Sequence, residues 1–350
     1  MKNFQTNMSS FYINNIGEIQ LKKFLNNNGN NIFILVDFNT EKFCLDLFLT
    51  TFNISNYQLL KVPCGESSKS LDYLSFLISE LVKKKADINS LLINLGGGVV
   101  CDLGGFLASV YNRGINFINV PTTLLAQVDA SIGGKNGINF DNIKNKIGLI
   151  NYPLFTVTLT KFLKTLPQNE ITSGYGEIYK YGLIYDLDFW NKLILEDLSF
   201  ENSKKIVHHS IKIKESIIKK DNKRKGFRNI LNFGHSIGHA IESSSSKSFH
   251  INHGLAVVMG MICELYISHL VLNLSSNDLN QSINVLLKKF PTNKIPNLDL
   301  VIEYIKQDKK NNRGKLLFSL IPKVGCCYYN QEVNESIIYK FLIFYNQLHD

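Results

Sequence analysis

The chain has 350 residues, of which 45% are apolar and 19% are charged, and its formal net charge is +9. The apolar fraction is ordinary for a globular protein and excludes a largely disordered chain, while the length predicts two domains or one large one. The excess positive charge could attract nucleic acid, a membrane surface or a phosphorylated small substrate, or it could reflect a Lys- and Asn-biased composition with solvated lysines. The basic residues are scattered and not interleaved with aromatic residues, so we do not expect nucleic acid as a partner.

The N-terminus and the cysteines give little sign of export. Residues 1–5 (MKNFQ) contain no apolar signal segment, so we expect a cytoplasmic protein. None of the six cysteines forms a C-x-x-C pair, and we expect reduced thiols. The longest apolar segment, residues 256–274, contains Glu264 and His269, which favours a buried helix over a membrane span.

Strand-like and helix-like segments alternate through the first half of the chain. Residues 31–37 (NIFILVD), 90–95 (SLLINL) and 116–120 (NFINV) are short apolar runs that suit buried strands. Residues 70–83 and 99–111 carry apolar side chains at helical spacing. This alternation predicts an α/β domain, Rossmann-like, in which helices cover a parallel sheet.

The second half has mostly helical periodicity. The predicted helices span residues 171–184, 203–220, 229–242, 255–273 and 277–289, with loops at 243–248 and 291–296. We therefore predict an α/β domain over residues 1–160 and an all-α domain over residues 161–350.

Three features of the first half are typical of ligand sites. Gly96–Gly98 lies between a predicted strand and a predicted helix, where glycines allow a phosphate to approach the backbone and the helix N-terminus. A tight turn is the alternative explanation. Asp37 ends a predicted strand, which is the position of acidic residues that bind the ribose of a dinucleotide. The alternative is that Asp37 is only part of a turn. Residues 119–139 follow the third predicted strand and are rich in Thr, Asp and Lys, which indicates either a ligand-binding loop or an ordinary polar one.

The second half contains a candidate metal site. His235 and His239 are four residues apart and so share one face of a predicted helix, as paired metal ligands do. His253 follows in the sequence, and Glu177 lies within an otherwise apolar helix. Three such ligands and one open position make a catalytic zinc site, whereas a hydrogen-bonded histidine pair is the simpler alternative.

Together these segments closely resemble the 3-dehydroquinate synthase family of sugar-phosphate cyclases, from about Asp37 to Gly325. The family's motifs occur in order as GE-x-x-K (Gly65–Lys69), GGGVVCDLGGF (Gly96–Phe106), Y-x-RG (Tyr111–Gly114), VPTTLLAQVDASIGGKNGIN (Val120–Asn139), KN-x-IG (Lys144–Gly148), TLP (Thr165–Pro167), GEIYKYGLI (Gly176–Ile184), RNILNFGHSIGHAIE (Arg228–Glu242), HG (His253–Gly254) and DKK (Asp308–Lys310).

The resemblance implies an NAD-binding domain, a helical domain and an active site in the cleft between them. It implies that 3-deoxy-D-arabino-heptulosonate 7-phosphate becomes 3-dehydroquinate and phosphate. NAD transiently oxidises the C5 hydroxyl, phosphate is eliminated, C5 is reduced again, and ring opening and aldol closure follow. It also implies a homodimer, with no membrane and no nucleic acid as partners.

The resemblance also assigns site residues. It implies that zinc or cobalt is held by Glu177, His235 and His253, and it places His239 beside the substrate, although spacing alone would pair His239 with His235. The residues implied to bind or act on the substrate are Asp129, Lys135, Lys180, Lys214, Arg228, Asn232, His239, Lys309 and Lys310, with Arg113 reaching in from a partner subunit. The residues implied to contact NAD are Asp37, Glu66, Lys69, Gly97, Gly98, Asp102, Thr122, Thr123, Lys135, Lys144, Phe162 and Thr165.

Three positions depart from the family's pattern. Leu255 replaces the usual Glu after His-Gly, so a hydrogen-bond partner of His253 is missing or replaced. Residues 221–226 (DNKRKG) have lost two carboxylates, and Leu159 stands where an Asp is usual. None is an implied metal ligand or substrate lysine, so we expect the activity to be retained. The competing hypotheses are a cyclase for another phosphorylated sugar, a metal-dependent polyol dehydrogenase, and an inactive binding protein.

Overall fold

The computed structural model describes residues 9–28, 31–141, 143–221, 226–244, 251–307 and 316–350. The chain forms two compact units, Met1–Pro167 and Gln168–Asp350. The division falls after residue 167, whereas the sequence suggested a boundary after residue 160. Each unit is described by itself.

The first unit holds the strands. In chain order its elements are β1 (Ser10–Ile13), α1 (Asn14–Asn28), β2 (Ile32–Asp37), α2 (Phe38–Thr40), the π-helix η1 (Glu41–Leu45), α3 (Asp46–Phe52), β3 (Gln58–Val62), the 3₁₀ helix η2 (Glu66–Ser68), α4 (Leu71–Lys83), β4 (Leu91–Gly96), α5 (Gly98–Val110), the 3₁₀ helix η3 (Tyr111–Arg113), β5 (Asn116–Pro121), the π-helix η4 (Ala126–Ala130), β6 (Lys135–Phe140), β7 (Ile143–Ile150), β8 (Phe155–Thr158) and the 3₁₀ helix η5 (Thr160–Thr165).

Six of these strands form one parallel sheet in the order β1-β8-β5-β4-β2-β3. The predicted parallel α/β fold is confirmed. The strands β2 and β4 are almost continuous apolar runs, and they are buried along nearly their whole length. That pattern is required when helices cover both faces of a sheet.

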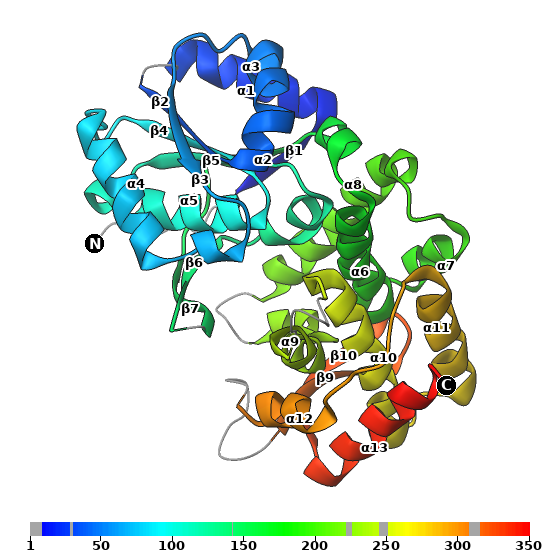
Figure 1. The fold of residues 1–350 in the computed structure, drawn as a ribbon. Helices are drawn as coiled ribbons and strands as arrows, with labels where there is room; N and C mark the ends of the chain where they lie inside the picture. The colour runs from blue at the N-terminus through cyan, green and yellow to red at the C-terminus, as the bar shows by residue number, and fades with distance from the viewer. Residues whose placement is uncertain (1–8, 29–30, 142, 222–225, 245–250, 308–315) are drawn as a thin grey trace. The chain divides into compact units, whose positions relative to one another are not determined.

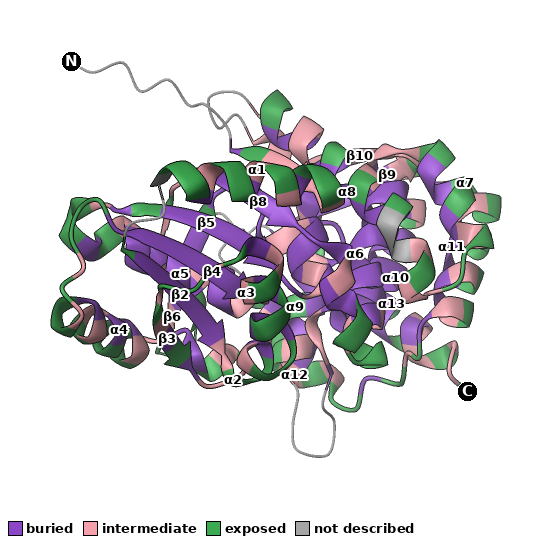
Figure 2. Ribbon diagram, turned by 90° about the horizontal axis from the view of Figure 1, so that it is seen from above, coloured by how far each residue is buried: buried purple, intermediate pink, exposed green. Residues whose placement is uncertain are grey.

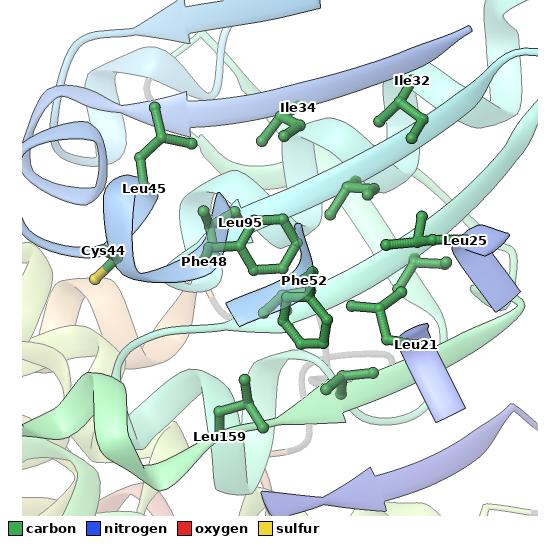
Figure 3. Close-up of a cluster of buried hydrophobic side chains, with 14 of the residues drawn as sticks. Leu21, Leu25, Ile32, Ile34, Cys44, Leu45, Phe48, Phe52, Leu95 and Leu159 are labelled. Carbon is green, nitrogen blue, oxygen red and sulfur yellow. The ribbon is translucent and has the colours of Figure 1, made fainter. Parts of the chain in front are cut away.

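Two apolar cores lie on the two faces of this sheet. Figure 1 shows α1 and α3 on one face and α4 and α5 on the other. Phe48 of α3 and Leu21 of α1 belong to the first core together with Ile34 of β2 (Figure 3). Leu77 of α4 and Phe106 of α5 belong to the second core. The chain therefore leaves β2 towards one face and β4 towards the other.

This reversal creates a binding position at the carboxyl edge of the sheet. Because the segments after β2 and β4 diverge to opposite faces, the ends of these two neighbouring strands bracket a topological switch point. Ligands of open α/β sheets bind at such points. Asp37 ends β2, and Gly97 follows β4.

The polar segment after β5 has more regular structure than the sequence suggested. Residues 126–130 form η4, and β6 pairs with β7 in an antiparallel hairpin. Residues 119–139 are therefore not one loop. The strand β7 has no buried residue and is exposed over its first half, so it lacks the continuous apolar run of the buried strands.

The second unit is rich in helix. In chain order its elements are α6 (Gln168–Tyr185), α7 (Leu187–Leu195), α8 (Phe200–Lys220), the 3₁₀ helix η7 (Phe227–Asn232), α9 (His235–Ser243), α10 (His253–Leu272), α11 (Ser276–Lys289), α12 (Leu298–Lys306), β9 (Leu316–Lys323), β10 (Cys326–Val333) and α13 (Glu335–Gln347). The antiparallel hairpin β9–β10 was absent from the predicted all-α domain, and this is a correction to it.

A second correction concerns the predicted helix over residues 229–242. The structure divides this segment into η7 and α9, with Gly234 between them in the left-handed region at φ 78°. A Cβ atom at Gly234 would lie 2.5 Å from Cγ of Met261 and 2.8 Å from the carbonyl oxygen of Val257. The close approach of α10 thus divides a segment whose apolar spacing looks continuous.

The helix α10 is the central helix of the second unit. Its length and composition would suffice to cross a membrane, but 67% of its most apolar window is buried within the protein, as in the core helix of a globular protein. Figure 2 shows this helix largely in the buried colour. It packs against α6, α9, α11 and α13.

Two glycines let α6 and α10 touch through their backbones. A Cβ atom at Gly254 would lie 1.9 Å from the carbonyl oxygen of Ser173, and one at Gly176 would lie 2.5 Å from the carbonyl oxygen of Gly254. The amide of Gly254 donates a hydrogen bond to Oγ of Ser173 at 3.1 Å. This crossing brings Glu177, next to Gly176, beside His253.

We expect Gly254→Ala to destabilise the second unit by about 1–3 kcal/mol or more, because the added methyl group forces α6 and α10 apart. Trp190, the single tryptophan of the chain, is buried in α7 of this unit, so its fluorescence in a urea titration reports the loss. The matched control is Asn280→Ala, at an exposed position of α11. An unchanged urea midpoint for Gly254→Ala would contradict the packing.

Candidate active site

A buried ion pair lies on α6. Glu177 and Lys180 are 0% and 1% exposed, one helical turn apart, and the Lys180 ammonium donates a hydrogen bond to Oε2 of Glu177. Burial by itself would raise the pKa of Glu177, but the charge of the Lys180 ammonium holds it well below its ordinary value. Glu177 is therefore a carboxylate inside the helical unit.

Two imidazoles converge on the other oxygen of this carboxylate. Nε2 of His235 lies 3.2 Å from Oε1 of Glu177, and Nε2 of His253 lies 3.6 Å from the same atom. Oε1 is buried and has no hydrogen-bond partner among the described residues. The site thus holds one carboxylate oxygen and two imidazole nitrogens that face each other without a hydrogen bond. This set of donor atoms suits a divalent metal ion.

The outer ring nitrogens of both histidines have their own acceptors. Nδ1 of His235 lies 3.2 Å from the carbonyl oxygen of Phe233, and Nδ1 of His253 lies 3.1 Å from Oε2 of Glu242. A proton on each Nδ1 leaves the lone pair of each Nε2 directed at Glu177, which is the tautomer that metal binding needs.

A third histidine borders this cluster. The ring of His239, one turn beyond His235 on α9, lies 5.1 Å from that of His235 and 5.7 Å from that of His253. Ligand atoms of the three histidines lie within 4.8 Å of one another. His239 is exposed, whereas Glu177 is buried. Geometry alone thus allows His239 either as a ligand or as a group beside the metal.

The imidazoles of His235 and His253 have opposite pKa shifts. Burial and the Lys180 charge lower the pKa of His235 to about 4, against the opposing effect of Glu177. Burial also lowers the pKa of His253, but the neighbouring carboxylates of Glu177 and Glu242 outweigh this and raise it to about 10. With no metal bound, His235 is therefore neutral and His253 is protonated, and a metal ion that binds Nε2 of His253 would displace the proton from that atom.

The other predicted substrate residues of this unit lie on elements that contact α6. Lys214 is on α8 and only 4% exposed, and Arg228 and Asn232 are on η7. Both α8 and η7 pack against α6, and against each other. Lys309 and Lys310 lie outside the described residues.

In the first unit, the glycine turn meets the turn after β5. A Cβ atom at Gly97 would lie 3.1 Å from Cγ2 of Thr123, and one at Gly98 would lie 3.1 Å from Cβ of Ala130. The amide of Thr122 donates a hydrogen bond to the carbonyl oxygen of Gly96 at 2.9 Å. Gly97 is the N-cap of α5 and provides no capping side chain, so the first amides of α5 suit a phosphate group.

A second group of predicted cofactor residues surrounds Lys69. Its side chain is 4% exposed, and its ammonium lies 2.7 Å from Oδ2 of Asp102 and 3.6 Å from Oε1 of Glu66. It also donates a hydrogen bond to Oδ1 of Asn145 at 2.7 Å. Glu66, Lys69 and Lys144 line a cavity of about 360 Å³. The structure thus brings Glu66, Lys69, Asp102 and Lys144 together.

Asp37 and Thr165 both lie close enough to the thiol of Cys44 to affect its pKa. Burial raises the pKa of Cys44 to about 12, the charge of Asp37 adds to this, and a hydrogen bond with Thr165 opposes it. Oδ1 of Asp37 accepts the amide of Thr40 at 2.7 Å and so caps α2. Phe162 is buried in η5 beneath this group. Asp129 lies in η4, Lys135 begins β6, and Arg113 is exposed in η3.

Two further residues organise these sites, although no sequence motif assigns them a role. Nε2 of Gln127 donates hydrogen bonds to the carbonyl oxygens of Pro121 and Leu159, both at 3.1 Å, and so joins the ends of β5 and β8. Glu242 contacts His253, as described above. Both residues lie inside motifs that the sequence analysis quoted, but their contacts depend on distant segments.

The fold is that of the sugar phosphate cyclases. A solved structure of 2-deoxy-scyllo-inosose synthase, complexed with carbaglucose-6-phosphate, NAD⁺ and Co²⁺, superimposes with a TM-score of 0.84 at 23% identity and covers 95% of each chain. The 2-epi-5-epi-valiolone synthase of Streptomyces hygroscopicus, with NAD⁺ and Zn²⁺ bound, has a TM-score of 0.84 at 21% identity and covers 97% of each chain.

Sequence comparison is more specific. Residues 59–173 match the family model "3-dehydroquinate synthase N-terminal", and residues 174–311 match "3-dehydroquinate synthase C-terminal". A 3-dehydroquinate synthase of Parabacteroides distasonis is 38% identical over 324 residues, which cover 90% of this chain and 91% of the relative. The chain belongs to the 3-dehydroquinate synthase family.

Proposed function

We propose that the protein converts 3-deoxy-D-arabino-heptulosonate 7-phosphate into 3-dehydroquinate and inorganic phosphate, and so serves the shikimate pathway. It is then a carbon–oxygen lyase without net redox change. The observation that carries the proposal is the convergence of Glu177, His235 and His253, in a chain whose two halves both match this family.

We infer that two bound groups, a nicotinamide cofactor and a divalent metal ion, supply hydride transfer and polarisation of the reacting hydroxyl. Bound NAD would accept the C5 hydride and return it, while a divalent metal, zinc or cobalt, would polarise the C5 hydroxyl. The residues that would hold the metal are Glu177, His235 and His253. The cyclases of similar fold whose structures contain NAD⁺ with Co²⁺ or Zn²⁺ support both groups.

The chain's own residues would then bind and orient the substrate. Lys180 keeps Glu177 ionised, and its buried ammonium provides positive charge beside the metal donors. Lys214, Arg228 and Asn232, together with Lys309 and Lys310, provide cations and an amide for a phosphate and a carboxylate. His239 would exchange protons with the substrate. Asp129 and Lys135 also belong to the proposed substrate set, and Arg113 would reach the substrate from a partner subunit. Homodimerisation and a cytoplasmic location stay predictions.

We propose that the first unit binds NAD at the switch point between β2 and β4. The α5 N-terminus after Gly97 and Gly98 would receive the pyrophosphate, and Asp37 would accept ribose hydroxyls. Glu66, Lys69, Asp102, Thr122, Thr123, Lys135, Lys144, Phe162 and Thr165 would form the rest of the proposed NAD contacts.

The function is tested with the purified protein, NAD and the heptulosonate phosphate. We expect stoichiometric release of phosphate and dehydroquinate, no accumulation of NADH, and loss of turnover after chelation that is restored by zinc or cobalt. Accumulating NADH would instead support a polyol dehydrogenase. If the protein turned over only another phosphorylated sugar, it would be a different cyclase. If it turned over no phosphorylated sugar, the result would support an inactive binding protein.

The role of Asp37 is separable from its helix cap. We expect Asp37→Ser to keep the cap on α2, because Ser and Asp cap equally well, and to weaken NAD binding about 10- to 100-fold through the lost charged hydrogen bond. The measurement is NAD affinity by calorimetry. Asp37→Asn retains an acceptor and should lose less. Wild-type NAD affinity in Asp37→Ser would remove Asp37 from the cofactor site.

A further inference from the structure

The face of α9 that carries His235 also carries a carboxylate at its far end. His235, His239 and Glu242 stand at positions i, i+4 and i+7 of one helix and so share a face. The helix packs against α10, whose first residue is His253 (Figure 1). One short helix thus presents a candidate ligand from its first turn and an acidic side chain from its last.

That acidic side chain touches the other candidate ligand. Oε2 of Glu242 lies 3.1 Å from Nδ1 of His253, and the two side chains are 15% and 28% exposed. The contact is therefore partly shielded from solvent, which strengthens a charge-assisted hydrogen bond. With Nδ1–H donating to Glu242, Nε2 is the ring nitrogen of His253 that faces Oε1 of Glu177 and that is left to bind a metal.

The two histidines are oriented by different means. His235 has a backbone acceptor, the carbonyl oxygen of Phe233, which side-chain substitution does not remove. His253 depends on a side chain from another element. The residue two positions after His253, Leu255, has no side-chain acceptor, and its amide donates to Oδ1 of Asn252 at the start of α10.

We propose that Glu242 is a positioning residue of the metal site. Its carboxylate fixes the tautomer and the orientation of His253 and raises the basicity of that ligand. Metal affinity in the second unit then depends on α9 twice, through His235 directly and through Glu242 by way of His253. This proposal rests on the proposed metal set of Glu177, His235 and His253.

The test measures metal binding by the full-length protein. The affinity for Zn²⁺ alone is obtained by competition with a chromophoric chelator, and the Co²⁺ absorption spectrum reports ligand geometry. We expect Glu242→Leu to weaken Zn²⁺ binding about 10- to 100-fold and to change the Co²⁺ spectrum. Glu242→Gln keeps an acceptor without charge and should retain part of the affinity. The matched control, Glu335→Gln, removes an exposed carboxylate from the first turn of α13 and should bind Zn²⁺ as the wild type does.

A merely structural role predicts a different pattern. It would lower the melting temperature of the metal-free protein and leave the Zn²⁺ affinity of the folded fraction unchanged, in Glu242→Leu and in Glu242→Gln alike. That result would overturn the proposal, as would Zn²⁺ affinity within twofold of wild type in both variants. If Glu242→Leu does not fold, the conservative Glu242→Gln decides by the same criterion.

Failure of the metal site itself is distinguishable from failure of this proposal. In the first case His235→Ala would bind Zn²⁺ as tightly as the wild type does, and the metal set would be wrong. In the second case His235→Ala would lose Zn²⁺ while both Glu242 variants retained it.

Discussion

His235→Ala is expected to abolish turnover and to weaken metal binding severely. The substitution removes the imidazole nitrogen that lies 3.2 Å from Oε1 of Glu177 and leaves two donors of the proposed three. Polarisation of the reacting hydroxyl by a metal contributes several kcal/mol to the transition state, so its loss should lower kcat/KM by more than about 1,000-fold. Phosphate release over a range of Zn²⁺ concentrations measures the effect.

Two further histidine variants make this result specific. His208→Ala removes an exposed imidazole of α8, and it should leave both metal affinity and turnover unchanged. His239→Ala separates the two roles that geometry allows for His239. Lower kcat with normal metal affinity would place it beside the substrate, whereas loss of the metal would make it a ligand. An active His235→Ala protein with normal metal affinity would contradict the proposed site.

Lys180→Met is expected to cause the largest loss of stability. It leaves the fully buried carboxylate of Glu177 without its ammonium partner, and breaking a buried ion pair from one side costs about 3–5 kcal/mol. The free energy of unfolding of the metal-free protein should fall by that amount in urea titrations followed by Trp190 fluorescence. Saturating Zn²⁺ should reduce the loss, because a cation at the metal site compensates the same carboxylate.

A double-mutant cycle tests the origin of this loss. Glu177→Gln combined with Lys180→Met removes both charges and should restore much of the stability that Lys180→Met loses. Lys192→Met, at an exposed position of α7, serves as the control and should change the free energy of unfolding little. Equal losses in the single and double variants would mean that the buried charge of Glu177 is not their cause.

Local sequence patterns were sufficient for the buried strands and long helices. The apolar runs at residues 31–37, 90–95 and 116–120 correspond to β2, β4 and β5, and the helical spacing of residues 70–83 corresponds to α4. Such elements are predictable because the residues that determine them lie within a few positions of each other. Ser70 even precedes α4 as its N-cap, with Oγ accepting the Tyr73 amide.

Elements that depend on distant packing were missed. The edge strand β1 is short and partly exposed, and the hairpin β9–β10 has an exposed second strand with register shifts, so neither produces a strong local pattern. The break at Gly234 is likewise invisible locally, because its cause is the approach of Met261 and Val257 from another helix.

The sequence by itself determined the class of the two halves and, through its motifs, the residue types available for chemistry. Only the tertiary structure decided that Glu177, His235 and His253, which come from α6, α9 and α10, meet at one carboxylate oxygen, and that Glu242 lies behind His253. The physical reason is the backbone contact between α6 and α10 at Gly176 and Gly254. A metal site requires distances set to a fraction of an ångström between segments remote in sequence, and periodicity along one segment contains no such information.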